Sequence, residues 1–71
     1  MTILGLYLLK KSINKAEVSR RTGISTSRLS ELTLNQTAKL RAEELYLIAL
    51  AIDTDPCILM KEACGHLKLG K

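Results

Sequence analysis

Short hydrogen-bonding side chains and one cation gather at a helix start in the middle of the chain. Thr26, Ser27 and Arg28 follow Ser25 in the stretch "GISTSRLSEL". The start of a helix exposes unpaired backbone N–H groups at the positive end of its dipole, so it attracts anions such as phosphate. Hydroxyl and guanidinium groups also hydrogen-bond to base edges. This pattern therefore predicts recognition of an anionic partner.

The residue types that catalyse reactions or bind metals are not spaced as a catalytic site or a metal site requires. His66 is the only histidine, and no nucleophile or carboxylate pair lies near it in sequence. Cys57 and Cys64 are seven residues apart, which on one helix separates them by about 10 Å, too far for a disulfide and awkward for one metal ion. We expect buried thiols, no enzyme activity, no metal and no cofactor.

Length and apolar runs predict one domain outside the membrane. Seventy-one residues allow a single small core, which we expect over about residues 3–64 of a 1–71 domain, followed by a short tail at 65–71. The apolar runs are too short to cross a bilayer, and no secretion signal is evident. We therefore expect a cytoplasmic protein of bacterial or phage type, with no membrane partner and no small-molecule substrate.

Positive charge is concentrated in the first half of the chain. The net charge is +4, and eight of the eleven cations lie between Lys10 and Arg41, against only Glu17 and Glu31. Residues 42–55 hold four acids and no cation. A basic small domain is more suited to bind nucleic acid or an anionic surface than an acidic substrate. We therefore expect the first half of the chain to contact that partner.

The hydrophobic pattern is helical throughout, and strand signals are poor. Asn14 reads as an N-cap with Glu17 as its capping-box partner, Ser25 as the next N-cap, and Asp55-Pro56 as the start of the last helix. The helices we expect span about 3–12, 15–22, 26–33, 42–52 and 56–64. Predicted core residues are Leu4, Tyr7, Leu8, Val18, Leu29, Leu32, Leu45, Ile48, Ala49, Ile52, Ile58 and Leu59, with a contribution from Met60.

The second and third helices are spaced as a helix-turn-helix. Ser19 is small enough to let the helices cross closely, and Gly23 can adopt the left-handed conformation of a helix end. Leu29 and Leu32 anchor the third helix from beneath. In such a motif the start of the second helix enters the major groove of DNA.

These residues resemble the Cro/C1-type (XRE-like) helix-turn-helix family of phage and bacterial regulators. The resemblance covers about residues 3–62 and lies in "INKAEVSRRTGISTSRLSELTLNQ" and "ELYLIALAIDTDPCIL". It implies an all-α, compact five-helix, lambda-repressor-like fold that binds double-stranded DNA as a transcriptional regulator, most simply a repressor. Lys15 departs from the glutamine that the family typically carries at the start of its second helix.

The resemblance also implies roles for individual residues. Base contacts would come from Thr26, Ser27, Arg28 and Glu31. Phosphate contacts would come from Asn14, Lys15, Thr37, Lys39 and Arg41. On this hypothesis Arg28 reads guanine in bidentate fashion, and Arg28→Ala relaxes the preference at one base pair.

Ordinary structural roles remain open for the same residues. Thr26 and Ser27 are also suited to a helix start, and Arg28 could be a surface cation paired with Glu31 or Glu17. Three apolar side chains of the fourth helix, Tyr46, Leu47 and Leu50, lie off its core stripe; either other helices cover them or they form a homodimer interface. The alternative function is a protein-interaction adaptor or an antitoxin-like module on the same fold.

Overall fold

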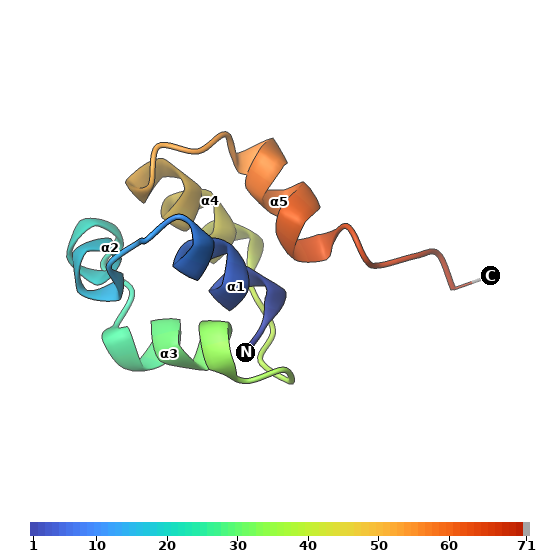
Figure 1. Cartoon of the computed structure of the whole chain (residues 1–71), viewed down its shortest axis with the longest axis horizontal. Helices are drawn as coiled ribbons and strands as arrows, with labels where there is room; N and C mark the ends of the chain where they lie inside the picture. Colours follow the sequence, from blue (N-terminus) through green and yellow to red (C-terminus); the bar gives the residue numbers. More distant parts are fainter. Residues whose placement is uncertain (71) are drawn as a thin grey trace.

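The computed structural model describes residues 1–70 and contains five α-helices and no strand within that range (Figure 1). Lys71, the end of the predicted tail, lies outside the described residues. The helices are α1 (Ile3–Lys10), α2 (Lys15–Thr22), α3 (Thr26–Leu34), α4 (Ala42–Ala51) and α5 (Pro56–Cys64). The predicted all-α, five-helix fold is confirmed. After α5 the chain leads away from the helices.

Local sequence accounts for most helix boundaries. Asn14 caps α2 by accepting a hydrogen bond from the Ala16 N–H at 2.8 Å, and Gly23 ends it in the left-handed conformation with φ of 81°. The predicted reciprocal bond from Glu17 is wrong, because its carboxylate pairs with Arg20 one turn along the helix. α1 ends at Lys10, earlier than predicted, because Ser12 turns the chain with φ of 57°.

The core lies among the five helices: α1 packs against α3 and α5, α2 packs against α3 and α4, and α4 packs against α5. Leu29, Ile48 and Leu59 come from three different helices and are fully buried. Fully burying such a side chain stabilises the fold by about 1.5–3 kcal/mol. Two predicted core contributions are wrong: Ile58 and Met60 are about half exposed, because Leu59 alone faces inward at that turn of α5. The other core residues are Leu4, Tyr7, Leu8, Val18, Leu32, Leu45 and Ala49, with Ile52 partly buried.

The N-terminal segment completes the last turn of α3. The N–H of Thr2 donates to the carbonyl of Thr33 at 2.8 Å, and its hydroxyl donates to the carbonyl of Leu32 at 2.8 Å. The same hydroxyl oxygen accepts the Gly5 N–H at 3.0 Å and so caps α1. Helix ends leave backbone groups unpaired unless side chains or other segments bind them. Thr2 therefore fixes the angle between α1 and α3.

Gly5 permits the close approach of α1 to α3. A Cβ atom at this position would overlap the carbonyl oxygen of Thr33, which is backbone and cannot move aside cheaply. We expect Gly5→Ala to destabilise the fold by about 1–2 kcal/mol. The overlap, worth about 1–3 kcal/mol, outweighs the gain in helix propensity of up to about 1 kcal/mol.

Denaturant unfolding measures this difference. Gly70→Ala is the matched control, because a Cβ at Gly70 meets no atom within 4 Å. A Gly5→Ala variant as stable as the parent would show that α1 does not need this close approach.

Candidate nucleic-acid interface

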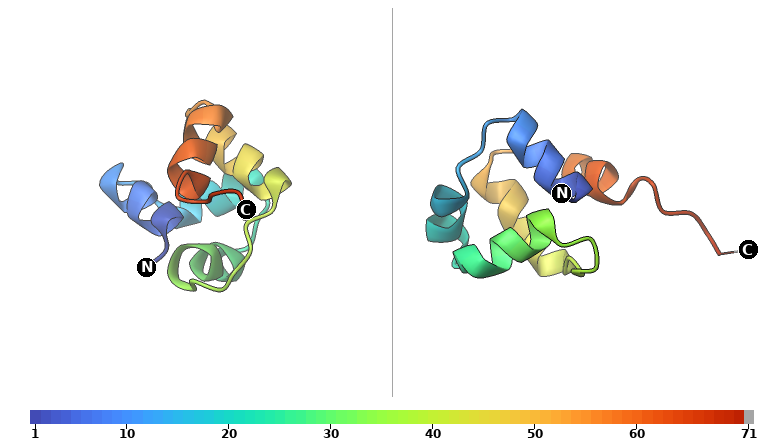
Figure 2. Two further views of the ribbon diagram at one scale, coloured as in Figure 1. Left: turned by 90° about the vertical axis from the view of Figure 1, so that its right-hand side faces the viewer. Right: turned by 60° about the horizontal axis from the view of Figure 1, so that its bottom comes forward.

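One face of α3 is left uncovered by the rest of the fold. Leu29, Leu32 and Thr33 are buried on its inner face. Because helix residues three or four apart share a face, the opposite side presents Ser27, Ser30, Glu31 and Leu34, here called the outward stripe. Ser30 is partly buried, and the other three are exposed. Thr26, the first residue of α3, is also exposed. Figure 2 shows α3 at the edge of the molecule.

Arg28 does not extend freely from this face. Its Nε donates to Oε2 of Glu44 at 2.8 Å, and its Nη2 donates to Oε1 of Glu44 at 3.0 Å. The same Nη2 donates to the carbonyl of Lys39 at 2.8 Å, and Nη1 donates to Glu31 at 2.7 Å. Its side chain is 29% exposed, and that of Glu44 is 13% exposed. Arg28 thus joins α3, the loop at 35–41 and α4, and its predicted base contact stays a prediction.

Glu44 belongs to the capping of α4 as well as to this ion pair. Its Oε1 also accepts the backbone N–H of Arg41 at 3.0 Å, three residues earlier, as in a capping box. The hydrogen bond from Arg28 holds the pKa of the Glu44 carboxyl below its ordinary value, opposed by partial burial. The pKa of the Arg28 guanidinium is raised, mainly by its hydrogen bond to Glu44 and then by that to Glu31. Both groups stay charged at neutral pH.

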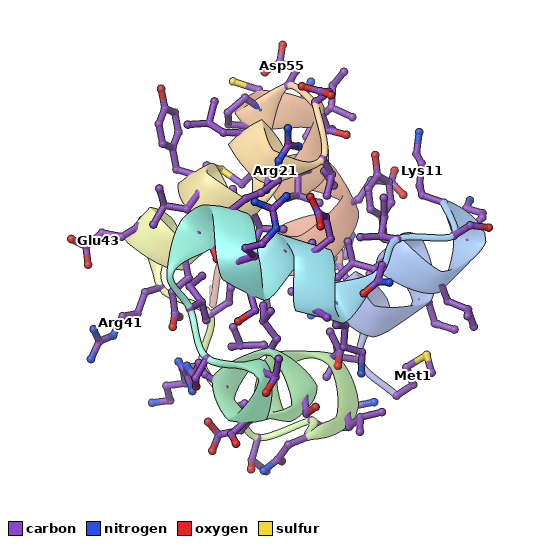
Figure 3. The ribbon with its side chains drawn as sticks, turned by 90° about the vertical axis from the view of Figure 1, so that its left-hand side faces the viewer. Met1, Lys11, Arg21, Arg41, Glu43 and Asp55 are labelled. Carbon is purple, nitrogen blue, oxygen red and sulfur yellow. The ribbon has the colours of Figure 1, made fainter. Side chains whose placement is uncertain are left out.

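The loop at 35–41 brings predicted phosphate contacts beside the start of α3. It leaves the end of α3, turns and leads to the start of α4 (Figure 2), and the carbonyl of Lys39 accepts a hydrogen bond from Arg28. Lys39 and Arg41 are exposed and make no ion pair with any described residue. Figure 3 shows Arg41 projecting outward. The Thr37 hydroxyl donates to Asn35 at 2.7 Å, so it must rotate before it can donate to a phosphate.

Asn14 and Lys15 lie at the start of α2, near the other end of α3. Lys15 and Thr33 line the same small pocket, together with Met1 and Leu9 of the N-terminal segment. The side-chain oxygen of Asn14 is used in capping, which leaves its NH2 group as a donor. Cationic and amide donors therefore flank α3 at both ends.

Two further cations of α2 point elsewhere. Arg20 pairs with Glu17, and Nη1 of Arg21 donates to the carbonyl of Ala51 at 2.6 Å at the end of α4. A donor near the last carbonyls of a helix stabilises that end. Arg21 therefore fastens α2 to α4.

Sequence reasoning missed three residues of this region. The sequence does not indicate the role of Glu44, since its partner Arg28 is sixteen residues away and their contact is tertiary. Ser30 and Leu34 were left out of the predicted base contacts. The signal for them was present: they follow Ser27 at spacings of three and seven, and α3 continues one residue past Thr33 to include Leu34, which is 52% exposed.

The Arg28–Glu44 pair predicts a stability loss in acid. The folded-state pKa of Glu44 lies below its ordinary 4.5, so its stabilising effect is present above that pH and is lost as pH falls through the folded value. We expect Glu44→Gln to be less stable at pH 7 and to lose less stability than the parent between about pH 5 and pH 2.

Urea unfolding across this range provides the measurement. Glu43→Gln, which removes an exposed neighbouring carboxylate, is the control and should follow the parent. Arg20 also lowers the pKa of Glu17. Every variant therefore still loses some stability as the pH falls. If the free energy of unfolding of Glu44→Gln and of the parent falls in parallel with pH, the Arg28–Glu44 pair is not the source of the acid sensitivity.

Comparison with known proteins identifies the family. The family model of the Cro/C1-type HTH DNA-binding domain matches residues 4–60, which include all of α2, α3, the loop and α4. No curated protein and no solved structure matches the chain significantly. None of the helices in residues 1–70 is long and apolar enough to cross a membrane, and no three His, Cys, Asp or Glu residues there are grouped to hold a metal ion. The chain belongs to the Cro/C1-type helix-turn-helix family, a non-catalytic family of DNA-binding domains.

Proposed function

We propose that this chain is a sequence-specific regulator of transcription, acting in the cytoplasm of a bacterial or phage-infected cell. Its simplest action is repression by occupying an operator. The observation that carries the proposal is the uncovered stripe of α3, flanked at both ends by cations that form no ion pair with an acidic side chain in residues 1–70. That arrangement suits a helix in the major groove with phosphates on either side.

Affinity in this proposal comes chiefly from phosphate contacts. Lys39 and Arg41 lie at the start of α3, and Asn14 and Lys15 lie toward its end, with Thr37 in the loop between α3 and α4. Lysine and arginine release counterions when they bind phosphates, so binding weakens as salt rises. The start of α2 adds the positive end of a helix dipole.

Specificity in this proposal comes from α3. Thr26 and Ser27 offer hydroxyls to base edges, and Glu31 can accept from the N4 amino group of cytosine. Glu31 also carries the ion pair with Arg28, which offsets its repulsion from nearby phosphates. Leu34 adds an exposed apolar group suited to the C5-methyl group of thymine.

A selection from randomised duplex DNA tests the proposal. The protein is incubated with the library at two salt concentrations, and the bound fraction is sequenced. We expect one enriched site. Binding without enrichment, lost by physiological salt, would reject specific regulation.

Homodimerisation is a further part of the proposal. Apolar side chains remain about half exposed on α1 and α4, among them Leu6, Leu9, Tyr46 and Leu50. A twofold dimer would set two α3 helices about 34–36 Å apart in successive major grooves. A selected site with two symmetric halves supports this arrangement, and a single half-site excludes it.

The same exposed side chains favour the second candidate function, binding of another protein as an adaptor or antitoxin. Exposed apolar side chains that repeat along one helix can mark protein contacts. A stoichiometric protein complex formed by a chain that selects no DNA site would favour this second candidate.

Lys39→Ala and Arg41→Ala should each weaken binding to cognate and scrambled duplexes alike. Each should also reduce the slope of log K against log salt by about 0.9, the value for one lost phosphate contact. Fluorescence anisotropy titrations at several salt concentrations measure both quantities. Lys61→Ala, which removes an exposed lysine of α5, is the control with no expected change. An unchanged salt slope in both loop variants would show that the loop does not contact DNA phosphates.

Leu34→Ala should reduce preference for a thymine at one position of the selected site. The expected factor is about fourfold, corresponding to about 0.8 kcal/mol for one buried CH2 group. Replacing that thymine by deoxyuridine, which lacks the methyl group, should weaken the parent by the same factor and leave Leu34→Ala unchanged. Equal sensitivity of both proteins to deoxyuridine would exclude Leu34 as the methyl reader.

A further inference from the structure

The hydrogen bonds of Arg28 limit what it can offer to DNA. Arginine has five N–H donors, and four hydrogen bonds from Arg28 to Glu44, Glu31 and Lys39 occupy four of them. Bidentate recognition of guanine needs two donors. Such a contact must therefore break at least one bond that the free protein already makes.

Withdrawal of Arg28 would also leave two carboxylates without their cation. Glu44 is only 13% exposed in its side chain and would keep only the N–H of Arg41 as a partner. Removing one member of a buried ion pair costs far more than the pair itself contributes. Glu31, on the outward stripe, would face the phosphates uncompensated.

The partners of Arg28 connect the elements that meet DNA in the proposed function. Its bond to the Lys39 carbonyl holds the loop, and its bonds to Glu44 hold the start of α4, where Glu44 binds the Arg41 N–H. Lys39 and Arg41 are thereby placed at a set distance from the start of α3.

We propose that Arg28 is a positioning residue rather than a base reader, and that through Glu44 and the Lys39 carbonyl it fixes the phosphate-binding loop relative to α3. This inference rests on the proposed function. It assigns base reading to Thr26 and the outward stripe, and it makes Glu44, which touches no DNA, necessary for binding.

Binding of the selected duplex and of its single base-pair variants tests this role. Arg28→Ala and Glu44→Gln should each weaken every duplex by a similar factor of about tenfold, within the range of coupling between contacting residues. The ranking of base pairs should not change, and the double variant should bind about as well as either single one. The salt slope should also fall, because loop phosphates are lost.

The opposite pattern would overturn the proposal. If Arg28 reads a base, Arg28→Ala removes preference at one base pair only, and Glu44→Gln frees the guanidinium and retains or sharpens that preference. Two controls separate positioning from general destabilisation. Glu43→Gln should bind as the parent does, and Leu59→Val, a core change in α5, should lower stability without altering the salt slope.

Hydrogen exchange in the DNA-free protein tests the same constraint independently of the proposed function. The N–H groups of Ala38 and Arg41 do not bond to Arg28, yet their exchange should become faster in Arg28→Ala and stay unchanged in Leu59→Val. Unchanged exchange in Arg28→Ala would overturn the positioning role even if the parent binds DNA. A parent that selects no duplex, with faster loop exchange in the variant, would reject the proposed function and retain the constraint.

Discussion

The ion pair between Arg28 and Glu44 joins the starts of α3 and α4, and the placement of the outward stripe depends on it. α3 contributes only Leu29, Leu32 and Thr33 to the buried interior. Apolar burial is not directional, so these residues hold α3 against the core without fixing its rotation. Hydrogen bonds at both ends of α3 fix this rotation. Arg28 makes them at the start of the helix, and Thr2 makes them to the carbonyls of its last turn.

The same pair resolves an electrostatic conflict within the fold. A cation in the first turn of a helix opposes the helix dipole, and an acid there is favourable. Arg28 and Glu44 each occupy the third residue of their helices, and their contact offsets the unfavourable position of Arg28. Because Arg28 is neutralised internally, the cations near α3 that form no ion pair within residues 1–70 are Lys15, Lys39 and Arg41.

Helical periodicity and capping signals were enough to predict the architecture. Leu4 and Leu8, Leu29 and Leu32, and Leu45 and Ile48 repeat at helical spacing and are buried as expected. Contacts between distant segments could not be predicted in this way. The bonds of Thr2 to α3 and of Arg28 to Glu44 link residues sixteen or more positions apart, and short-range patterns carry no information about them.

The location of the candidate interface therefore stays a prediction from the sequence, whereas its internal bonding was not predicted. The residue type of Arg28 indicated a hydrogen-bond donor to a base, whereas in the structure its guanidinium donates to Glu44. The early end of α1 at Lys10, before the turn at Ser12, and the exposure of Ile58 beside the buried Leu59 were also not predicted.

The most direct measurement is the Nε–H resonance of Arg28 in NMR spectra of the protein, alone and bound to its selected duplex. If Arg28 stays on Glu44, this resonance keeps its shift and slow exchange, while signals of Ser27, Ser30 and the Leu34 methyl groups move. A large change at Arg28 Nε, with release of the Glu44 carboxylate, would contradict the central claim and make Arg28 a base reader.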